Sequence, residues 1–400
     1  MSYNIYAALE IGTSRTVLAV AECETGSKLA VTSIASIPSI GVRKSQITDI
    51  EQASQSIRGV IGAIERKAKQ DGGSIDIANA FLVVNGQHIS ANQLSSTVSI
   101  SGKTVSDEDI EDVVNSARQL GPSGGERVGL DIVEQDFSVD QRGGILSPKN
   151  IAGHVLKLNV LCISAEKNRI EDARTAADAV HLELRDPLFS CTCAADAVLE
   201  DYEKKNGVLV LDFGGGSTGY AVYADGYLVS TGAIGVGGDH ITNDLAQAFQ
   251  LSSAHAEILK QQNASAVVSS LDSDDRIVIE PQSIGQNERT VSRRTVNIVT
   301  NARVKELIAM IRERLEEHDL INRLHAGIVI TGGGAQLKDL DLLLQRELGT
   351  SVRIGKPIHI DGLEEEEFPA ACASIAGALI YAHRNYEEHS IFDTLKGIFR

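Results

Sequence analysis

Three glycine turns, each placed at the end of an apolar strand-like run, constrain the fold of this chain more than any other feature. The strand-like runs cover residues 3–12, 207–216 and 327–331. Glycine lets the backbone approach a ligand closely and point its amides inward, and serine or threonine hydroxyls add donors. Two such turns that face each other can hold a polyphosphate chain, and a third that precedes a helix can hold a nucleoside. The turns consist of Gly12, Thr13 and Ser14; of Gly214, Gly215, Gly216, Ser217 and Thr218; and of Gly332, Gly333 and Gly334.

The first two turns belong to a strand–turn–strand unit that occurs twice. Residues 15–21 predict a second strand after the first turn, and residues 218–229 predict a hairpin with Asp225 and Gly226 at its own turn. Two copies of one unit predict a bilobed protein with related halves. The length of 400 residues also exceeds what one ordinary core accommodates.

The sequence excludes the two commonest nucleotide-binding motifs. It contains neither GxxxxGK[ST] nor a GxGxxG after the first strand, so P-loop and Rossmann folds lose their main support. Asp212 directly precedes the second turn and is the carboxylate best placed to hold hydrated magnesium or to orient a water. Glu10 occupies the equivalent position before the first turn. The alternative for both is a strand-end residue that caps its own turn.

Composition limits the partners and the compartment. The 37 lysines and arginines against 54 aspartates and glutamates give a net charge of −17, which disfavours nucleic-acid binding. The 5 cysteines are odd in number and scattered, which is typical of free thiols in a reducing compartment. We find no signal peptide and no apolar run of roughly 20 residues that could span a bilayer, so we expect a cytosolic protein.

The rest of the chain predicts alternating helices and strands with one insertion. Residues 85–163 change to short strands around one helix at 107–120, for which Ser106 is the N-cap, and we interpret them as an inserted unit. Helical periodicity also predicts helices at 52–70, 166–180, 191–203, 243–249, 254–260, 295–317, 337–348 and 369–381.

The last eleven residues predict a short amphipathic helix. At 100° per residue its apolar side chains fall within a stripe of about 120°. A helix of this length is roughly 16 Å long, too short to cross a membrane but suited to lie in its interface. Residues 383–389 look like a polar spacer that frees this tail; the alternative is a tail packed on the protein's own core. The expected membrane-facing set is Ile391, Phe392, Leu395, Lys396, Ile398, Phe399 and Arg400.

The order of these motifs resembles the actin, Hsp70 and sugar-kinase superfamily, in which two phosphate loops and an adenosine loop occur in this sequence. The run GGDHITNDLA at residues 237–246 is similar to a signature of the FtsA family of bacterial cell-division proteins. Residues 292–294, residues 328–336 and the insertion also resemble that family. The resemblance covers nearly the whole chain, and the GGDHITNDLA run is its most specific part.

The resemblance implies an α/β fold: a bilobed, actin-like (ribonuclease H-like) ATPase fold with an inserted 1C subdomain of SHS2 type. It divides the chain into subdomain 1A at 1–84, 164–205 and 346–385; subdomain 1C at 85–163; subdomain 2A at 206–245 and 300–345; subdomain 2B at 246–299; and a spacer with an amphipathic membrane-targeting helix at 386–400.

The resemblance also implies ATP, with magnesium, bound between the lobes. The phosphates would meet the first two turns and Asp212, which would also carry the metal, while Gly332, Gly333 and Gly334 would meet the adenosine. Glu257 and Lys260 match an ExxK pattern that faces the adenosine, although an ordinary exposed helix face is the alternative. Two departures from the superfamily, Glu10 in place of aspartate and Gly219 in place of a common acidic residue, imply slow or absent hydrolysis.

The partners implied by the resemblance are those of a divisome adaptor on the cytoplasmic face of the inner membrane at the division site. Arg303 and Glu306 resemble positions that meet the C-terminal peptide of FtsZ; a solvated surface pair is the alternative. The tail would bind inner-membrane lipids, copies would self-associate, and subdomain 1C could meet other divisome proteins. A PilM-type scaffold of type IV pilus assembly is the competing interpretation. A sugar or acetate kinase would need a catalytic base and a substrate pocket, for which the sequence offers no candidate.

Overall fold

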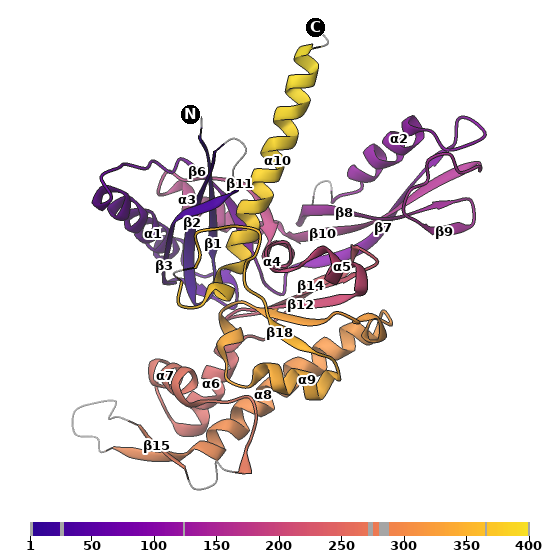
Figure 1. The fold of residues 1–400 in the computed structure, drawn as a ribbon. Helices are drawn as coiled ribbons and strands as arrows, with labels where there is room; N and C mark the ends of the chain where they lie inside the picture. The colour runs from indigo at the N-terminus through magenta and orange to yellow at the C-terminus, as the bar shows by residue number, and fades with distance from the viewer. Residues whose placement is uncertain are drawn as a thin grey trace.

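The computed structural model describes residues 3–24, 28–122, 125–270, 275–279, 288–364 and 366–398, with the backbone alone for Tyr3, Glu24 and residues 386–398. Two five-stranded sheets with one topology form the centre of the two lobes (Figure 1). In each sheet, three antiparallel strands follow one another and two further strands lie parallel to the first. The prediction of two related halves is therefore confirmed.

The two sheets have matching strand orders. Read from its third antiparallel strand, the first sheet has the order β3-β2-β1-β6-β11, and the second has the order β14-β13-β12-β17-β18. The first sheet consists of β1 (Tyr3–Ile11), β2 (Arg15–Glu24), β3 (Ala30–Pro38), β6 (Asn79–Val84) and β11 (Glu183–Phe189). The second consists of β12 (Val208–Phe213), β13 (Thr218–Ala224), β14 (Tyr227–Ile234), β17 (Gly327–Thr331) and β18 (Val352–Ile354).

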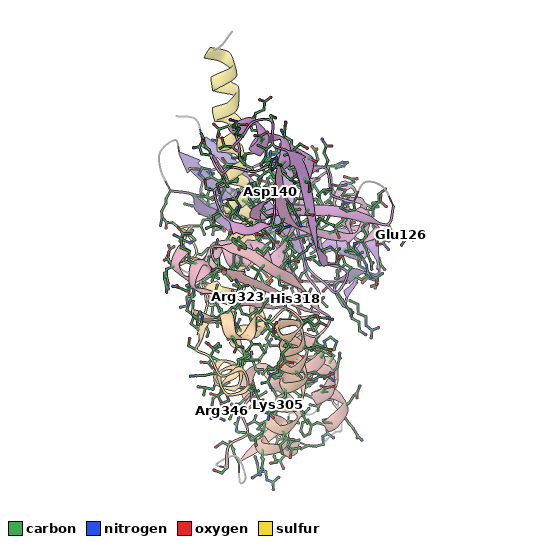
Figure 2. All side chains as sticks on the ribbon, turned by 90° about the vertical axis from the view of Figure 1, so that its right-hand side faces the viewer. Glu126, Asp140, Lys305, His318, Arg323 and Arg346 are labelled. Carbon is green, nitrogen blue, oxygen red and sulfur yellow. The ribbon has the colours of Figure 1, made fainter. Side chains whose placement is uncertain are left out.

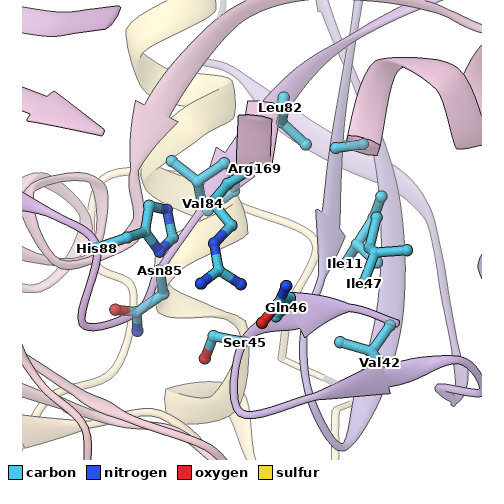
Figure 3. Close-up of a pocket in the computed structure, with 12 residues that line it drawn as sticks. Ile11, Val42, Ser45, Gln46, Ile47, Leu82, Val84, Asn85, His88 and Arg169 are labelled. Carbon is cyan, nitrogen blue, oxygen red and sulfur yellow. The ribbon is translucent and has the colours of Figure 1, made fainter. Parts of the chain in front are cut away.

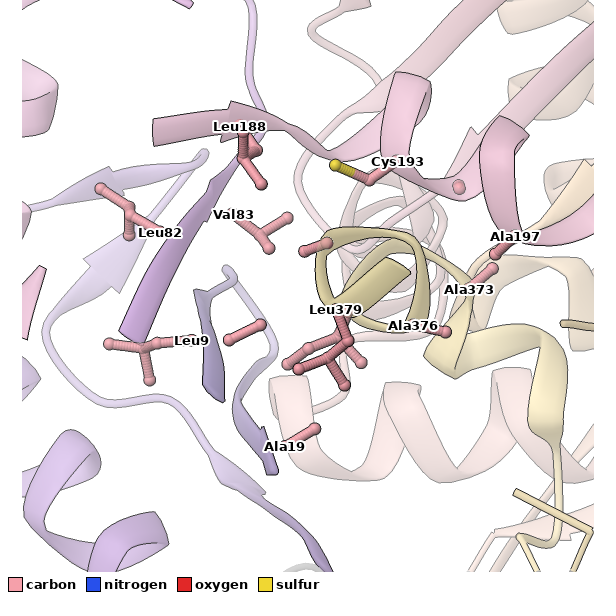
Figure 4. Packing of buried hydrophobic residues seen from close by; sticks show 14 of the residues in the cluster. Leu9, Ala19, Leu82, Val83, Leu188, Cys193, Ala197, Ala373, Ala376 and Leu379 are labelled. Atoms are coloured by element: carbon pink, nitrogen blue, oxygen red, sulfur yellow. The ribbon is translucent and has the colours of Figure 1, made fainter. Parts of the chain in front are cut away.

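Helices α4 (Ser190–Val198) and α10 (Ala373–Ile398) pack against each other between the sheets. Figure 4 shows Leu379 of α10 facing the apolar side chains of the first sheet, with Cys193 of α4 close by. A methyl group added at Gly377 would lie 1.7 Å from the carbonyl oxygen of Cys193. Only glycine at this position therefore lets the two helices approach so closely.

On its other face the first sheet carries α1 (Ile50–Gln70) and α3 (Lys167–Asp178), which pack against each other. The side chain of Asp49 accepts a hydrogen bond from the Gln52 amide and so caps α1. A small hairpin, β4 (Val42–Arg43) and β5 (Gln46–Ile47), precedes α1 and reaches toward the second lobe.

The insertion forms a separate four-stranded antiparallel sheet with the order β7-β10-β8-β9 and one helix. Ser106 caps this helix in a reciprocal capping box with Asp109, as its sequence predicts. The expectation of short strands is wrong, because β8 and β10 contain 13 and 12 residues. The elements are β7 (Ser90–Ser99), α2 (Asp107–Arg118), β8 (Arg127–Val139), β9 (Arg142–Ile145) and β10 (Val155–Glu166).

The second sheet is covered by helices that extend to the far end of the molecule (Figure 1). Figure 2 shows Lys305 and Arg346 on this lower lobe and Asp140 on the insertion at the opposite end. The elements are α5 (Asp201–Asn206), α6 (Gly238–Phe249), α7 (Ser253–Asn263), β15 (Arg276–Ile279), β16 (Arg289–Ser292), α8 (Arg293–Glu316) and α9 (Leu340–Leu348), with 3-10 turns at Ile321–Arg323, Gly333–Gln336 and Pro369–Cys372.

Several expected boundaries differ from the structure. The helix expected at 191–203 is two helices, because Leu199 has an extended backbone (φ −97°, ψ 141°). The residues expected to form a polar spacer, 383–389, belong to α10, which is continuous from Ala373 to Ile398. The expected subdomain limits at 299/300 and 385/386 consequently fall inside α8 and α10. All 5 cysteines are free and buried, as expected, and among the described helices none is long and apolar enough to cross a membrane.

Candidate functional site

The first two glycine turns face each other where the lobes meet. In the first, the amide of Gly12 donates to the carbonyl of Arg15 (3.0 Å), and in the second that of Gly214 donates to Ser217 (3.0 Å). A methyl group added at Gly215 would lie 2.0 Å from Ser14 Oγ, and one at Gly216 would lie 2.3 Å from Thr13 Oγ1. The turns are therefore in direct contact, and a side chain at Gly215 or Gly216 would have to displace Ser14 or Thr13.

Ser45, which the sequence analysis did not single out, joins the two turns. It lies in the β4–β5 hairpin with a positive φ of +57°. Its amide donates to Thr13 Oγ1 (2.8 Å), and its hydroxyl lies 3.1 Å from the hydroxyl of Ser217. These partners are 32 and 172 residues away in sequence, so no local pattern could have indicated them.

The GGDHITNDLA run forms helix α6, whose N-terminus packs on the second turn. The amides of Gly238 and Asp239 donate to the carbonyls of Gly214 (3.0 Å) and Gly215 (2.9 Å). A methyl group at Gly237 would lie 2.4 Å from the Gly215 carbonyl oxygen, which explains the glycine there. Asp239 also accepts a hydrogen bond from Ser14 Oγ (3.2 Å), so α6 contacts the turns of both lobes.

Two carboxylates lie behind the turns, each held by a serine from a helix between the sheets. Ser374 of the α10 segment donates to Glu10 Oε2 (2.7 Å), and Ser190 of α4 donates to Asp212 Oδ2 (2.9 Å). Burial and the nearby charge of Asp212 raise the pKa of Glu10 to about 7. Burial also raises the pKa of Asp212. Among the described residues no cluster of three or more metal-ligating side chains occurs, so these two carboxylates stand as a pair.

Packing against α4 explains why glycine occupies position 219. Gly219 is buried on β13, and a methyl group there would lie 2.7 Å from Cys191 Cβ. An acidic side chain at this position therefore has no room in this protein.

The third turn lies beside the second. Gly332 has a φ of +81°, and a methyl group there would lie 2.6 Å from Asp212 Oδ1. A methyl group at Gly334 would lie 2.7 Å from the Phe213 ring, whereas one at Gly333 would meet nothing within 4 Å. Gly333 therefore borders open space, while its two neighbours pack against the end of β12.

Glu257 and Lys260 are not an ordinary exposed pair. Lys260 Nζ lies 2.7 Å from Glu257 Oε2 and donates to the carbonyl of Gly238 (3.1 Å) and to Thr242 Oγ1 (2.9 Å). Burial would raise the pKa of Glu257, but the charge and hydrogen bonds of Lys260 outweigh it and lower that pKa. The pair thus lies against the start of α6, close to the second turn.

Arg303 joins α8 to α6. Its Nε and Nη2 donate to the two carboxylate oxygens of Asp244 at 2.6 Å and 2.9 Å, and it also forms an ion pair with Glu306. The hydrogen bonds to Asp244 raise the pKa of Arg303. The side chain of Arg303 is three-quarters buried, so the alternative of a solvated surface pair does not hold for Arg303.

The expected membrane residues lie at the end of α10. Ile391, Phe392, Leu395, Lys396 and Ile398 belong to the part of α10 for which the backbone alone is described, and Phe399 and Arg400 lie outside the described residues. Both views show the end of α10 projecting from the body of the molecule (Figures 1 and 2).

Solved structures of the same fold come from several functional classes. The chain is similar to a protein of the PilM–PilN type IV pilus biogenesis complex (TM-score 0.65, 17% identity, 94% of this chain and 98% of that one). It is also similar to MreB5 of Spiroplasma citri bound to AMPPNP (TM-score 0.55, 15% identity, 97% and 98%). At these identities the likeness establishes the bilobed actin-like fold alone.

Comparisons of sequence are more specific. The model of the cell division protein FtsA matches residues 209–376, and the model of the SHS2 domain inserted in FtsA matches residues 86–164. FtsA of Escherichia coli K12 is 29% identical over 390 residues, covering 96% of this chain and 91% of its own. FtsA of Bacillus subtilis is 29% identical over 385 residues, covering 96% and 84%. Both the actin-like lobes and the insertion therefore match one family, and the chain belongs to the FtsA family of bacterial cell division proteins.

Proposed function

We propose that this cell division protein binds ATP between its lobes, self-associates, and tethers FtsZ filaments to the inner membrane at the division site. The observation that carries the nucleotide part is the direct contact of two glycine turns, Gly215 against Ser14 and Gly216 against Thr13, with a third turn beside them. Backbone amides and hydroxyls concentrated in this way favour phosphate groups. The same fold holds ADP and AMPPNP in MreB5 of Spiroplasma citri.

The carboxylates fit a hydrated magnesium ion that accompanies ATP. Glu10 and Asp212 supply oxygen ligands, which Mg²⁺ prefers, and each has a raised pKa that a nearby cation would relieve. Asp212 borders both the second and the third turn, so we assign the metal contact to it. Serine hydroxyls fix the positions of both carboxylates.

The adenosine would lie between the third turn and α7. Gly333 borders open space, and Lys260 and Glu257 form a fixed polar pair at the start of α6, which packs on the second turn. We propose slow or absent hydrolysis, because Glu10 stands where the superfamily usually has aspartate, and its extra methylene moves the carboxylate by about a bond length. Glu10 thus remains an unfavourable feature for turnover, whereas Gly219 reflects packing.

We assign the FtsZ C-terminal peptide to the face of α8 that carries Arg303 and Glu306. Glu306 is the more exposed of the two, with 47% of its side chain accessible. Arg303 is bonded to Asp244 of α6, and α6 bonds to the second turn. A peptide that engaged Arg303 would therefore be linked, through Asp244 and α6, to the second turn.

The membrane role rests on the sequence of the tail and on the projection of α10. One short amphipathic helix has modest affinity for lipid, which the acidic body opposes, but many copies along a filament gain avidity. The pilus-type scaffold keeps only the support of a shared fold, since both family models are those of FtsA. Other divisome proteins could bind the inserted subdomain.

Nucleotide binding is tested by titrating the full chain with a fluorescent ATP analogue and magnesium. Lys260→Ala removes the cation beside α6, and we expect at least a fivefold loss of affinity. Lys67→Ala is the matched control, since Lys67 is an exposed lysine on α1, far along the chain from the turns. Failure of the unmodified chain to bind the analogue, or equal effects of both variants, would contradict the proposed site.

A further inference from the structure

A cavity of about 40 Å³ lies directly behind the first glycine turn (Figure 3). Ile11, the residue before Gly12, and Ser45, which joins the two turns, both line it. One water molecule needs roughly 10–15 Å³ of such space, so the cavity has room for several waters or one small polyatomic ion. Its apolar side includes Ile11, Val42, Ile47 and Leu82, and its polar side includes Ser45, Gln46, Asn85, His88 and Arg169.

Two buried nitrogen atoms on the polar side have no hydrogen-bond partner. Within the described part of the chain, the buried side-chain atoms that lack one are His88 Nε2 and Arg169 Nη1. His88 is only 9% exposed, so water at the surface does not satisfy its ring. Figure 3 shows the Arg169 guanidinium pointing between Asn85 and Ser45, with the His88 ring on the same side. Buried polar groups are nearly always paired, so a ligand that accepts from both atoms is indicated.

The charge around the cavity is positive. Arg169 Nε pairs with Glu166 (3.1 Å), while Arg127 donates to the His88 carbonyl (2.9 Å) and to Ser164. Two guanidinium groups and one carboxylate therefore lie near His88. Burial and the charge of Arg169 lower the pKa of His88 to about 4, so the ring is neutral at physiological pH. A neutral ring still donates from Nε2 in one tautomer.

We propose that this cavity is a binding site for inorganic phosphate, held by Arg169, His88 and Ser45. Guanidinium groups recognise phosphate oxygens through paired N–H donors, and the apolar wall limits the size of the ion. Ser45 also contacts Thr13 and Ser217, so this site and the turns share one wall. Phosphate binding at this site does not depend on ATP, so it does not rest on the proposed function.

The site is tested by an NMR titration of the full chain, labelled on its histidine rings, with sodium phosphate against sodium chloride of equal ionic strength. Saturating ADP keeps phosphate from the glycine turns, and a parallel series omits it. His88→Gln assigns the signal. We expect the His88 signal to shift and saturate in the millimolar range, while that of exposed His181 stays in place.

Two arginine variants locate the ion. Arg169→Gln is expected to weaken phosphate binding at least tenfold. Arg174→Gln, an exposed arginine on the same helix, is expected to change it less than twofold. If Arg169→Gln fails to fold, Ser45→Gly removes one donor without touching the Arg169–Glu166 pair and is expected to weaken binding several-fold.

An immobile His88 signal at tens of millimolar phosphate would overturn the proposal and leave water as the occupant. Equal weakening by Arg169→Gln and Arg174→Gln would overturn it too, since the ion would then bind elsewhere. ADP affinity is measured on the same samples, so a failure of the phosphate site is distinguishable from a failure of the nucleotide site.

Discussion

The hydroxyl oxygen of Ser45 lies 3.1 Å from that of Ser217, so the β4–β5 hairpin of the first lobe is bonded to the second lobe where the glycine turns meet. The amide of the same residue is bonded to Thr13 of the first turn. A single small residue thus couples the two halves across the proposed phosphate position.

Removing the Ser45 hydroxyl should loosen this junction. Ser45→Gly keeps the positive φ of +57° without strain but removes the bond to Ser217. We expect a loss of about 0.5–1.5 kcal/mol in the free energy of unfolding and faster release of a fluorescent ATP analogue. Stopped-flow dissociation measures the release. Lys44→Gly, the exposed neighbour with a φ of +51°, is the control, and equal release rates for both variants would contradict the coupling.

Contact between the turns predicts a specific rescue. Gly215→Ala places a methyl group 2.0 Å from Ser14 Oγ, so we expect it to cost about 1–3 kcal/mol of stability and to weaken ATP binding. Ser14→Gly removes the opposing side chain and should restore part of that stability in the double variant. Chemical unfolding of the four proteins measures the coupling energy. Additive effects would mean that the two residues do not meet.

Substitutions at two glycines of the third turn should affect different properties, one the stability and the other the nucleotide affinity. Gly334→Ala places a methyl group 2.7 Å from the Phe213 ring, so it should lower the melting temperature. Gly333→Ala meets nothing within 4 Å and should leave the melting temperature unchanged while altering affinity for ATP. Thermal unfolding and nucleotide titration of both variants check this. A Gly333→Ala protein with unchanged affinity would argue against adenosine at this turn.

The Glu10 carboxyl predicts a pH dependence of stability. Its pKa rises from 4.5 to about 7 on folding, so the folded state binds the proton more tightly than the unfolded state. The stability contribution of this group therefore falls as pH rises from about 4.5 to about 7 and is constant above that range. Glu10→Gln should remove this fall and be more stable than the unmodified chain at pH 8, by roughly 1–3 kcal/mol, but not at pH 4. A stability difference that does not change with pH would contradict the raised pKa.

Local sequence patterns predicted most helices, strands and turns, but they could not predict contacts between residues far apart in the sequence. The glycine turns, the Ser106 cap and the turn at Asp225 each depend on a few neighbouring residues, and the structure confirms all three. Ser190 and Ser374 hold carboxylates that are 22 and 364 residues away, so a serine in a small-residue helix gave no indication of its role. The polar segment at 383–389 and the tail belong to one continuous helix, since polar composition does not by itself end a helix.

In the proposed function, nucleotide binding, self-association and membrane attachment act together in one molecule. Co-sedimentation with liposomes that contain anionic lipid tests this, using the full chain and a version that ends at His389, each with and without ATP. We expect that the full chain pellets with liposomes, that ATP increases the pelleted fraction, and that the truncated chain stays in solution. Equal behaviour of the two chains would contradict it, because the end of α10 would then have no part in membrane binding.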